Sequence, residues 1–376
     1  MDKNESLLQN VVKNITFKSN IKDFSVFNIK HDLDKDILHP RKEIEAFAST
    51  ISEFLIVGIN QYPLIIGPTG SGKTAIVKFV LNELVELIDK PSKIHYVNCH
   101  IANNSYRVIK ELTKVRQKIA KDQVFSGFIK MIEENKELKN IIILDEIDFL
   151  KDDDIIYQVT RNSAFDKTLL VMITTVADYY NSLSLDVKSS LNLKSFCFNP
   201  YNAEDVYAIL KKRAEKGLIN YDDSIIRQIA SLNTKDCGGD VRVGIKTIEQ
   251  VFKYEDYKKY DSLDIKKIME EEELKIKNGI IHGLPEIKLK ALYLAPTKPN
   301  SNMVYKELCA NLGYKISKTY FFQIIDSLIK LGLLTAQRIR AGRTSSYQYT
   351  LNAKRSSLEY IKKLIDGYDN FTNSKS

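Results

Sequence analysis

Short apolar runs recur through the first two hundred residues, and stretches with helical spacing separate them. The runs cover residues 62–66, 93–99, 141–144 and 169–175, and each has the length of a buried strand. The helix expected after the first run carries an apolar face made of Ile76, Val77, Val80, Leu81, Leu84 and Leu87. Strands that alternate with helices predict a mostly parallel sheet with right-handed crossovers, so this region has an α/β pattern.

Two further helical stretches belong to the same region. One begins after Pro40, which suits a helix start. Its apolar positions are Ile44, Phe47, Ile51, Phe54 and Leu55. The other covers residues 103–138 and is expected to break near Asp122–Gly127. Residues 1–30 are polar with scattered apolar positions and predict a mobile or accessory arm.

From Pro200 onward the pattern becomes helical. Three stretches carry an apolar stripe and predict a small helical domain: residues 203–216, 222–233 and 240–253. Asn202 and Asp222 are good N-caps for two of these helices. The charged residues 261–277 predict the solvated face of a connecting helix.

The last hundred residues change character. Three helices are expected over residues 285–294, 301–311 and 317–331. Two strand-like stretches, 333–340 and 345–351, follow them and are joined by Ala341-Gly342-Arg343-Thr344. Three helices followed by a hairpin form the winged variant of the helix-turn-helix, so the chain is expected to end in an α+β winged-helix domain.

Composition narrows the class of protein. The 376 residues suffice for two or three domains, and the formal net charge of +8 favours an anionic partner. The four cysteines have no paired metal-ligand spacing and are expected to be reduced, mostly packed thiols. No apolar stretch approaches membrane-spanning length and no signal-peptide run begins the chain. We therefore expect a cytoplasmic, nucleoid-associated protein without a membrane partner.

A glycine-rich loop joins the first expected strand to its helix: Gly67-Pro68-Thr69-Gly70-Ser71-Gly72-Lys73-Thr74. Glycines let backbone N–H groups turn toward phosphate oxygens, and the helix N-terminus adds partial positive charge. Lys73 is expected to reach the β- and γ-phosphates of ATP, and the Thr74 hydroxyl to ligate Mg²⁺. The alternative is an ordinary turn before a core helix, but the flanking strand and helix favour a site for ATP or ADP.

Two carboxylates follow the run at residues 141–144, at the end of a strand expected to be buried on both faces. Open parallel sheets bind ligands at that end of their strands. Asp145 is expected to hold Mg²⁺, directly or through water, and Glu146 to polarise the attacking water. The alternative is an acidic surface turn, which the preceding phosphate loop makes the weaker interpretation.

Further nucleotide contacts are expected around this loop. A segment just upstream of a phosphate loop often folds over the base, so His39 and Arg41 are candidates for the base pocket. As simple helix-entry residues they are equally well explained. Ala75, Tyr201 and Arg213 complete the residues expected at the nucleotide.

The winged domain supplies candidate contacts to double-stranded DNA. Its third helix begins with Lys318, Thr319, Tyr320 and Gln323, at the end that meets base edges in helix-turn-helix docking. The hairpin carries Arg338, Arg340 and Arg343. A winged domain that binds only protein is the alternative, and the basic hairpin favours DNA.

Together these features resemble the archaeal replication initiators of the AAA+ class, which are related to the largest origin-recognition subunit and to the cell-division-cycle helicase loader. The resemblance runs from Leu38 to the C-terminal wing. Its most specific motifs are Gly67–Thr74, Leu144–Asp148, Val187-Lys188-Ser189-Ser190-Leu191 and Phe198–Glu204. It implies an N-terminal arm at 1–30, an AAA+ base domain at 31–199, a helical lid at 200–280 and a winged-helix domain at 281–376.

The resemblance also implies roles for particular residues. Gly239-Asp240-Val241-Arg242 is similar to the family's sensor-2 motif, which would place Arg242 on the γ-phosphate. Asn98-Cys99 and Tyr106-Arg107-Val108 resemble the start of the initiator-specific insertion, which touches DNA in this family. At sensor 1 the family usually has Asn, and this chain has Thr175. No arginine finger is identifiable, and Lys188 is the nearest basic residue to its expected position.

The resulting hypothesis is a slow ATPase that binds origin DNA as a replication initiator and helps to recruit the replicative helicase, as a monomer in solution or in an assembly on DNA. The alternative is a transcription regulator or plasmid partition factor with the same domains, bound at operator sites. A metabolic phosphate-loop kinase is disfavoured, because it would not need a winged domain.

Overall fold

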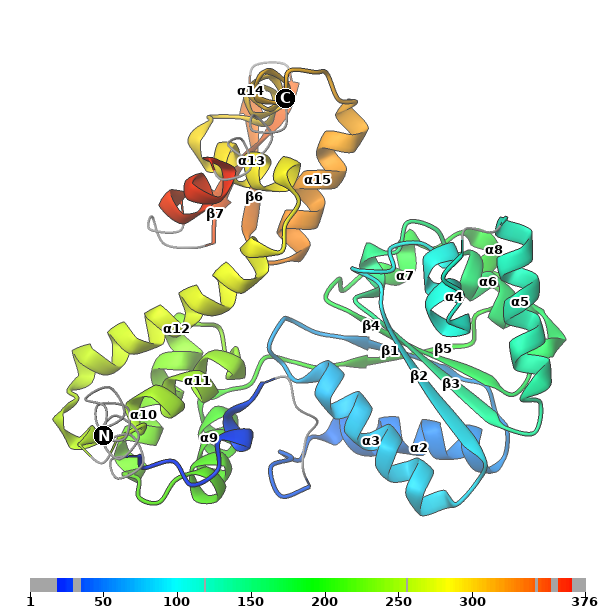
Figure 1. The fold of residues 1–376 in the computed structure, drawn as a ribbon, viewed down its shortest axis with the longest axis horizontal. Coiled ribbons are helices and arrows are strands. Elements are labelled where there is room, and N and C mark those ends of the chain that lie inside the picture. Colours follow the sequence, from blue (N-terminus) through cyan, green and yellow to red (C-terminus); the bar gives the residue numbers. More distant parts are fainter. Residues whose placement is uncertain are drawn as a thin grey trace, which may run out of the picture. The chain divides into compact units, whose positions relative to one another are not determined.

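The computed structural model describes residues 19–29, 35–117, 120–254, 256–341, 344–352 and 358–366, with the backbone alone at residues 340, 341, 344 and 345. The chain divides into two compact units, Met1–Tyr260 and Asp261–Ser376. Figure 1 shows the elements of each unit. Among the described residues, no helix combines the length and the apolar character that crossing a membrane requires.

A five-stranded parallel sheet forms the centre of the first unit. Its strands are β1 (Tyr62–Ile66), β2 (Ser92–Asn98), β3 (Lys139–Asp145), β4 (Thr168–Thr174) and β5 (Leu193–Cys197). They pair in the order β2-β3-β4-β1-β5, and every pairing is parallel. β3 and β4 are almost wholly buried, as expected for central strands covered on both faces.

Helices cover both faces of this sheet. They are α2 (Lys42–Ile56), α3 (Lys73–Ile88), α4 (Ser105–Thr113), α5 (Lys121–Glu134), α6 (Asp154–Arg161), α7 (Tyr179–Ser182) and α8 (Leu185–Ser190), with 3-10 turns η2 (Ile147–Phe149) and η3 (Ser163–Phe165). In Figure 1, α2 and α3 lie on one face and α4 to α8 on the other. Right-handed crossovers explain this division. The connection from β1 to β2 crosses the sheet in one direction, whereas the connections from β2 to β3, β3 to β4 and β4 to β5 run in the opposite direction and so place their helices on the other face.

Two local predictions in this domain were wrong. The helical region 103–138 does not break near Asp122–Gly127, which lies inside α5. α4 instead ends at Thr113, where Lys114 adopts a left-handed conformation with φ of 57°. An interior glycine costs only about 1 kcal/mol, and the buried α5 residues Val124, Phe128 and Ile132 offset it. On α3, Leu87 is 75% exposed and does not belong to the buried face.

Three helices form the lid that follows the sheet: α9 (Ala203–Gly217), α10 (Asp223–Asp236) and α11 (Val241–Val251). Asn202 accepts a hydrogen bond from the Asp205 N–H, and Asp222 accepts one from the Ser224 N–H, so both predicted N-caps are present. The 3-10 turns η1 (Phe24–Phe27) and η4 (Tyr257–Lys259) belong to the same unit.

Residues 19–29, which were expected to belong to a mobile or accessory arm, pack against this unit. Ser19 pairs with Tyr254 and Ile21 with Leu218 in antiparallel bridges, which attach the segment to the lid. Residues 1–18 lie outside the described residues. Of the four free cysteines, Cys99 is buried and Cys197 is exposed, so the expectation of mostly packed thiols holds only in part.

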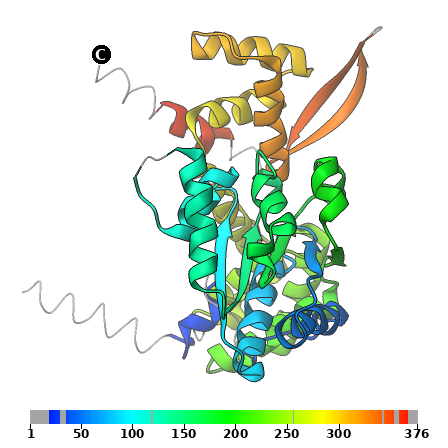
Figure 2. The same ribbon diagram turned by 90° about the vertical axis from the view of Figure 1, so that its right-hand side faces the viewer.

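The second unit has the elements of a winged helix. It contains α12 (Ser262–His282), α13 (Glu286–Leu294), η5 (Ala295–Thr297), α14 (Ser301–Leu312), α15 (Lys318–Lys330), β6 (Leu334–Ala341) and β7 (Thr344–Leu351). The two strands pair antiparallel from Leu334 opposite Leu351 to Ala341 opposite Thr344. Figure 2 shows this hairpin as a long ribbon that extends beyond the helices.

The unit boundary lies earlier than residue 280, where the lid was expected to end. α12 groups with the C-terminal unit, because Ile281 at its end is buried in the same core as Leu289 and Leu308. Lys277 also donates a hydrogen bond to the Asn352 carbonyl at 2.6 Å. Within the acidic run of α12, Glu272 is buried and bonds to Lys275, so that part of the helix is not a solvated face.

Candidate nucleotide-binding site and DNA interface

The phosphate loop lies between β1 and α3, and glycine is required at three of its positions. Gly70 and Gly72 have φ of 80° and 81°, in the left-handed region that side chains disfavour. A Cβ at Gly67 would overlap the Phe198 carbonyl, and one at Gly70 would overlap the Asp240 carboxylate. The loop therefore packs against β5 on one side and against the lid on the other.

Lys73 begins α3 and is folded back over this loop. Its Nζ donates hydrogen bonds to the carbonyls of Gly67 at 2.6 Å and Pro68 at 2.8 Å. Burial lowers the pKa of Lys73 to about 8, although the nearby Asp145 carboxylate opposes the shift. A buried ammonium held by carbonyl oxygens is suited to an anionic ligand.

Thr74 and Asp145 meet where α3 begins and β3 ends. The Thr74 hydroxyl donates to Asp145 Oδ2 at 2.9 Å, and the Tyr96 hydroxyl donates to the same oxygen at 2.8 Å. A hydroxyl and a carboxylate are the oxygen ligands that Mg²⁺ prefers. No cluster of three or more metal-ligating side chains occurs in the described part of the chain, so phosphate oxygens and water would have to supply the other ligands.

Glu146 follows directly in a strained backbone conformation, with φ of 53°. Its side chain is half-buried, and burial together with the neighbouring Asp145 raises its pKa. A carboxylate with a raised pKa at the end of a central strand is a suitable general base for a bound water.

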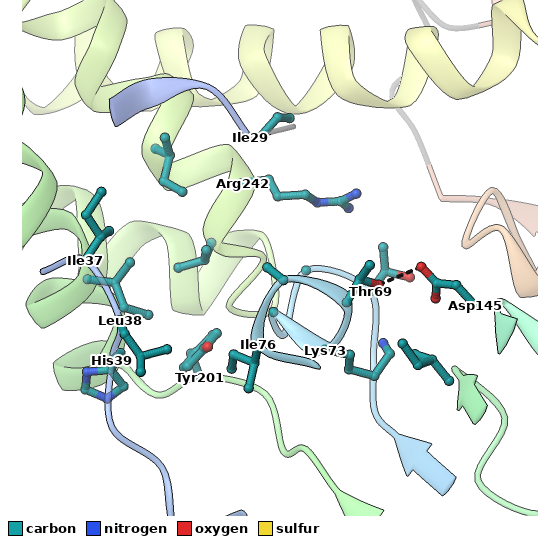
Figure 3. A pocket seen from close by; sticks show the side chains of 18 of the residues that line it. Ile29, Ile37, Leu38, His39, Thr69, Lys73, Ile76, Asp145, Tyr201 and Arg242 are labelled. Carbon is teal, nitrogen blue, oxygen red and sulfur yellow. Dashed lines mark hydrogen bonds between the residues drawn. The ribbon is translucent and has the colours of Figure 1, made fainter. Parts of the chain in front are cut away.

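These groups open into a cavity of about 310 Å³ between the sheet and the lid. Figure 3 shows its two ends. At the loop end lie Thr69, Lys73 and Asp145. At the far end lie Ile37, Leu38, His39 and Tyr201. One end is thus charged and polar, and the other is mainly apolar with aromatic edges.

The lid contributes Arg242 to this cavity. Arg242 Nε and Nη2 donate to the Asp240 carboxylate at 2.9 and 2.5 Å, and Asp240 also caps α11 by accepting from the Arg242 N–H. The Arg242 guanidinium is therefore held by a carboxylate only two residues away in the chain. Figure 3 shows the Arg242 side chain extending toward the loop end.

Of the other residues expected at the nucleotide, four line the cavity and one does not. Ala75, His39, Tyr201 and Arg213 line the cavity, and a Cβ at Gly72 would lie 2.9 Å from the Tyr201 hydroxyl. Arg41 does not line it. Its guanidinium donates to the Ser71 carbonyl at 3.1 Å and lies 4.3 Å from the centre of the Tyr201 ring, so it braces the loop.

Thr175, the residue expected at sensor 1, and its neighbour Thr174 both line the cavity at the end of β4. Thr174 donates through its hydroxyl to the buried Asp148 at 2.7 Å, and the Thr175 N–H donates to the same oxygen at 3.4 Å. Because the Thr174 hydroxyl is already engaged, the Thr175 side chain is the better candidate to meet a ligand. Lys188 donates to the Asn181 carbonyl at 2.9 Å and is part of α8.

Several lining residues had no recognisable signal in the sequence. They are Asn28, Ile29, Ile37, Ile209 and Ile245. The first three belong to an N-terminal region without a motif, and the isoleucines of α9 and α11 are indistinguishable in sequence from core positions. Leu38 was marked only as the beginning of the segment that contains His39.

The candidate DNA contacts are exposed on the C-terminal unit. Lys318, Thr319, Tyr320 and Gln323 are exposed on the first turns of α15. Arg338 is exposed on β6. The Arg340 side chain and all of Arg343 lie outside the described residues.

Comparison with known proteins agrees with this architecture. A family model described as an AAA domain matches residues 60–177. The ORC1-type DNA replication protein of Picrophilus torridus is 28% identical over 93% of this chain and 92% of its own length, and that of Thermococcus kodakarensis is 28% identical over 89% and 88%. The Aeropyrum pernix ORC1 protein, solved in complex with DNA, matches 92% of this chain and 97% of its own with a TM-score of 0.69 at 24% identity.

These matches confirm the expected fold class, an AAA+ parallel-sheet domain with a helical lid followed by a winged helix. They extend over nearly the whole chain and agree with the motifs at Gly67–Thr74 and Leu144–Asp148. Over nearly its whole length the chain is therefore similar to the ORC1-type DNA replication proteins.

Proposed function

We propose that this protein is an ATP-dependent DNA replication initiator, which binds double-stranded origin DNA and helps to recruit the replicative helicase. The observation that carries the proposal is that Lys73, Thr74, Asp145 and Arg242 line one cavity, in a chain that also contains a winged helix. The relatives named as ORC1-type DNA replication proteins favour initiation over the alternatives of transcription regulation or plasmid partition.

ATP binding follows from the two ends of the cavity. The loop N–H groups and the Lys73 ammonium would bind the phosphates at the loop end, and the apolar far end would take the adenine. Thr74 and Asp145 would hold Mg²⁺, which supplies positive charge to the phosphates. Glu146 would accept a proton from the attacking water, and the short Thr175 hydroxyl would position that water poorly, which would keep hydrolysis slow.

Hydrolysis would act as a switch through the lid. In the structure, Arg242 is bound to Asp240. A γ-phosphate competes with that carboxylate for the guanidinium and would draw α11 toward the loop. Loss of the γ-phosphate would return Arg242 to Asp240, so ATP and ADP would favour different lid positions.

DNA binding is assigned to the second unit. Gln323 is exposed on the helix that would enter the major groove, and an amide can bind an adenine edge bidentately. Arg338 on the hairpin would contact phosphates. The DNA-bound relative has the same fold over this region, which supports the assignment.

Genome-wide footprinting of the bound protein tests the initiator role. Binding should concentrate at the region where replication starts, and nascent-strand abundance should peak there. Sites confined to promoters, with no coincidence with replication starts, would refute the proposal in favour of a transcription regulator.

Two substitutions test how the winged helix reads DNA. Gln323→Ala should weaken binding to the footprinted site by about 1–3 kcal/mol and leave binding to a scrambled duplex nearly unchanged. Arg338→Ala should weaken binding to both duplexes. It should also make the affinity less dependent on salt concentration, by about the contribution of one phosphate contact. Fluorescence anisotropy across a salt series measures both effects, with Asn311→Ala, an exposed amide on α14, as the control. Parental binding by both variants would make the winged helix a protein-docking module.

A further inference from the structure

Tyr96 extends from the edge strand β2 to a carboxylate at the nucleotide site. Its backbone pairs with Ile143 of β3, two residues before Asp145. Its side chain therefore spans about 7 Å along the strands, and its hydroxyl donates to Asp145 Oδ2 at 2.8 Å. Thr74 and Asp145 line the cavity and Tyr96 does not, so Tyr96 contacts a residue of the site without facing the ligand.

The Asp145 carboxylate accepts hydrogen bonds at both of its oxygens. Oδ2 accepts from the Thr74 hydroxyl at 2.9 Å as well as from Tyr96, and Oδ1 accepts from the Glu146 N–H at 3.0 Å. Asp145 is only 5% exposed. A buried carboxylate bonded through both oxygens has a defined orientation. Of these bonds, the one from Tyr96 comes from neither the phosphate loop nor the acidic motif itself.

Helix α3 holds the Tyr96 ring in place. Lys78 follows Thr74 by four residues, so both side chains lie on the same face of this helix. The Lys78 ammonium lies 3.9 Å from the centre of the Tyr96 ring, and a cation over an aromatic face is a favourable contact. α3 thus supplies one donor to Asp145 through Thr74 and supports the other donor through Lys78.

We propose that Tyr96 is a positioning residue for Mg²⁺, because its hydroxyl orients Asp145 toward the metal that accompanies ATP. The inference rests on the proposed function, in which Thr74 and Asp145 hold this ion. A hydroxyl that donates its proton to Asp145 keeps its lone pairs, so the Thr74–Asp145 hydrogen bond is compatible with a cation at Thr74. Carboxylates that hold a metal are themselves oriented by hydrogen bonds, and loss of such a partner weakens metal binding by about 10- to 100-fold.

This role affects only one of two contributions to nucleotide affinity. The phosphate loop and Lys73 would bind the phosphates with or without the metal, whereas Asp145 adds affinity only when Mg²⁺ is present. The dissociation constant in excess EDTA, divided by that in saturating Mg²⁺, measures the second contribution. Titration of a fluorescent ATP derivative into the full chain under both conditions gives this ratio, and neither measurement depends on hydrolysis.

Tyr96→Phe keeps the ring beneath Lys78 and removes only the hydroxyl. It should lower the ratio by about tenfold and leave the dissociation constant in EDTA within about twofold of the parent value. Tyr157→Phe is the matched control and should change neither value, because Tyr157 has the same 38% exposure and carries a cation, Arg161, at 5.1 Å from its ring centre. If Tyr96→Phe does not fold, Lys78→Met, which removes the cation over the ring, should lower the ratio by a smaller factor.

A second background tests whether Tyr96 acts through Asp145. Asp145→Asn alone should lower the ratio, and Tyr96→Phe added to it should lower the ratio no further, because residues that act as a unit are not additive. Independent losses in the two backgrounds would overturn the inference.

Other results also decide the matter. An unchanged ratio in Tyr96→Phe would mean that its hydroxyl does not orient the metal ligand. Equal losses with and without Mg²⁺ would mean that Tyr96 only supports the shape of the site, and a parent protein whose affinity ignores Mg²⁺ would hold no metal at Asp145. Each of these outcomes overturns the inference. If the parent protein binds the derivative under neither condition, the proposed ATP site itself fails, which is a separate result.

Discussion

Lys73 should make ATP binding depend on pH in the mildly alkaline range. In the ligand-free protein, burial holds the pKa of Lys73 at about 8. Above that pH the side chain is mostly a neutral amine, which binds phosphate poorly. In the complex, the phosphate charge favours the ammonium and should return the pKa to its ordinary value of about 10.5 or higher. Binding therefore takes up a proton, and affinity falls as the pH rises through the free-state pKa.

The size of the effect follows from the two protonation equilibria. With pKa values of about 8 in the free protein and about 10.5 in the complex, the dissociation constant should rise about 15-fold between pH 8 and pH 9.5. This change corresponds to about 1.6 kcal/mol. At pH 9, binding should take up about 0.9 proton per ATP. The tyrosines at the site, Tyr96 and Tyr201, have raised pKa values and do not titrate in this range.

Titration calorimetry in buffers of different ionisation enthalpy measures the affinity and the proton uptake together. Lys73→Arg is the control, because its guanidinium stays protonated, so its weaker affinity should not vary between pH 8 and pH 9.5. A parent protein whose affinity is flat over this range, or which takes up no proton at pH 9, would refute the reasoning. It would mean that Lys73 is solvated in the free protein or lies away from the phosphates.

Two other substitutions test the chemistry at the loop end. Glu146→Gln should keep ATP bound but slow single-turnover hydrolysis by about 10²-fold or more, because an amide does not accept the proton; the parental rate in this variant would exclude Glu146 as the base. Thr175→Asn should speed single-turnover hydrolysis by about 3- to 30-fold, because the longer amide reaches a water that the threonine hydroxyl misses. A slower variant would mean that Thr175 already positions this water.

The parts of the site that the sequence predicted are those whose chemistry is local. The loop at Gly67–Thr74 needs left-handed glycines and an adjoining helix, and both requirements are visible in consecutive residues. The position of Asp145 was predictable because parallel strands end at the same edge of the sheet, so the last residue of β3 lies near the loop that follows β1. The fold class followed from the alternation of strands and helices for the same reason.

What escaped prediction depends on contacts between distant residues. Nothing near Asn20 in the sequence indicates that its amide will bond to Asn220 and Phe252, two hundred or more positions away. Arg41 was expected at the base because it stands before the loop, but it does not line the cavity and donates instead to the carbonyls of Ser71 and Asn199. The break before α5 was misplaced because a glycine was taken as the signal, while a left-handed lysine ends α4.

The lid meets the cavity through two separate groups, and this arrangement bears on how a nucleotide would control it. Arg242 belongs to α11 and extends to the loop end, where only the terminal phosphate differs between ATP and ADP. Arg213 belongs to α9, lines the same cavity and donates to the Val26 carbonyl. On the proposed function, a nucleotide contact at Arg213 would keep α9 attached in either nucleotide state, and hydrolysis would release only α11. The lid would then tilt about α9 and stay bound to the nucleotide. The change of lid position would thus follow hydrolysis itself and would not require ADP to leave the site.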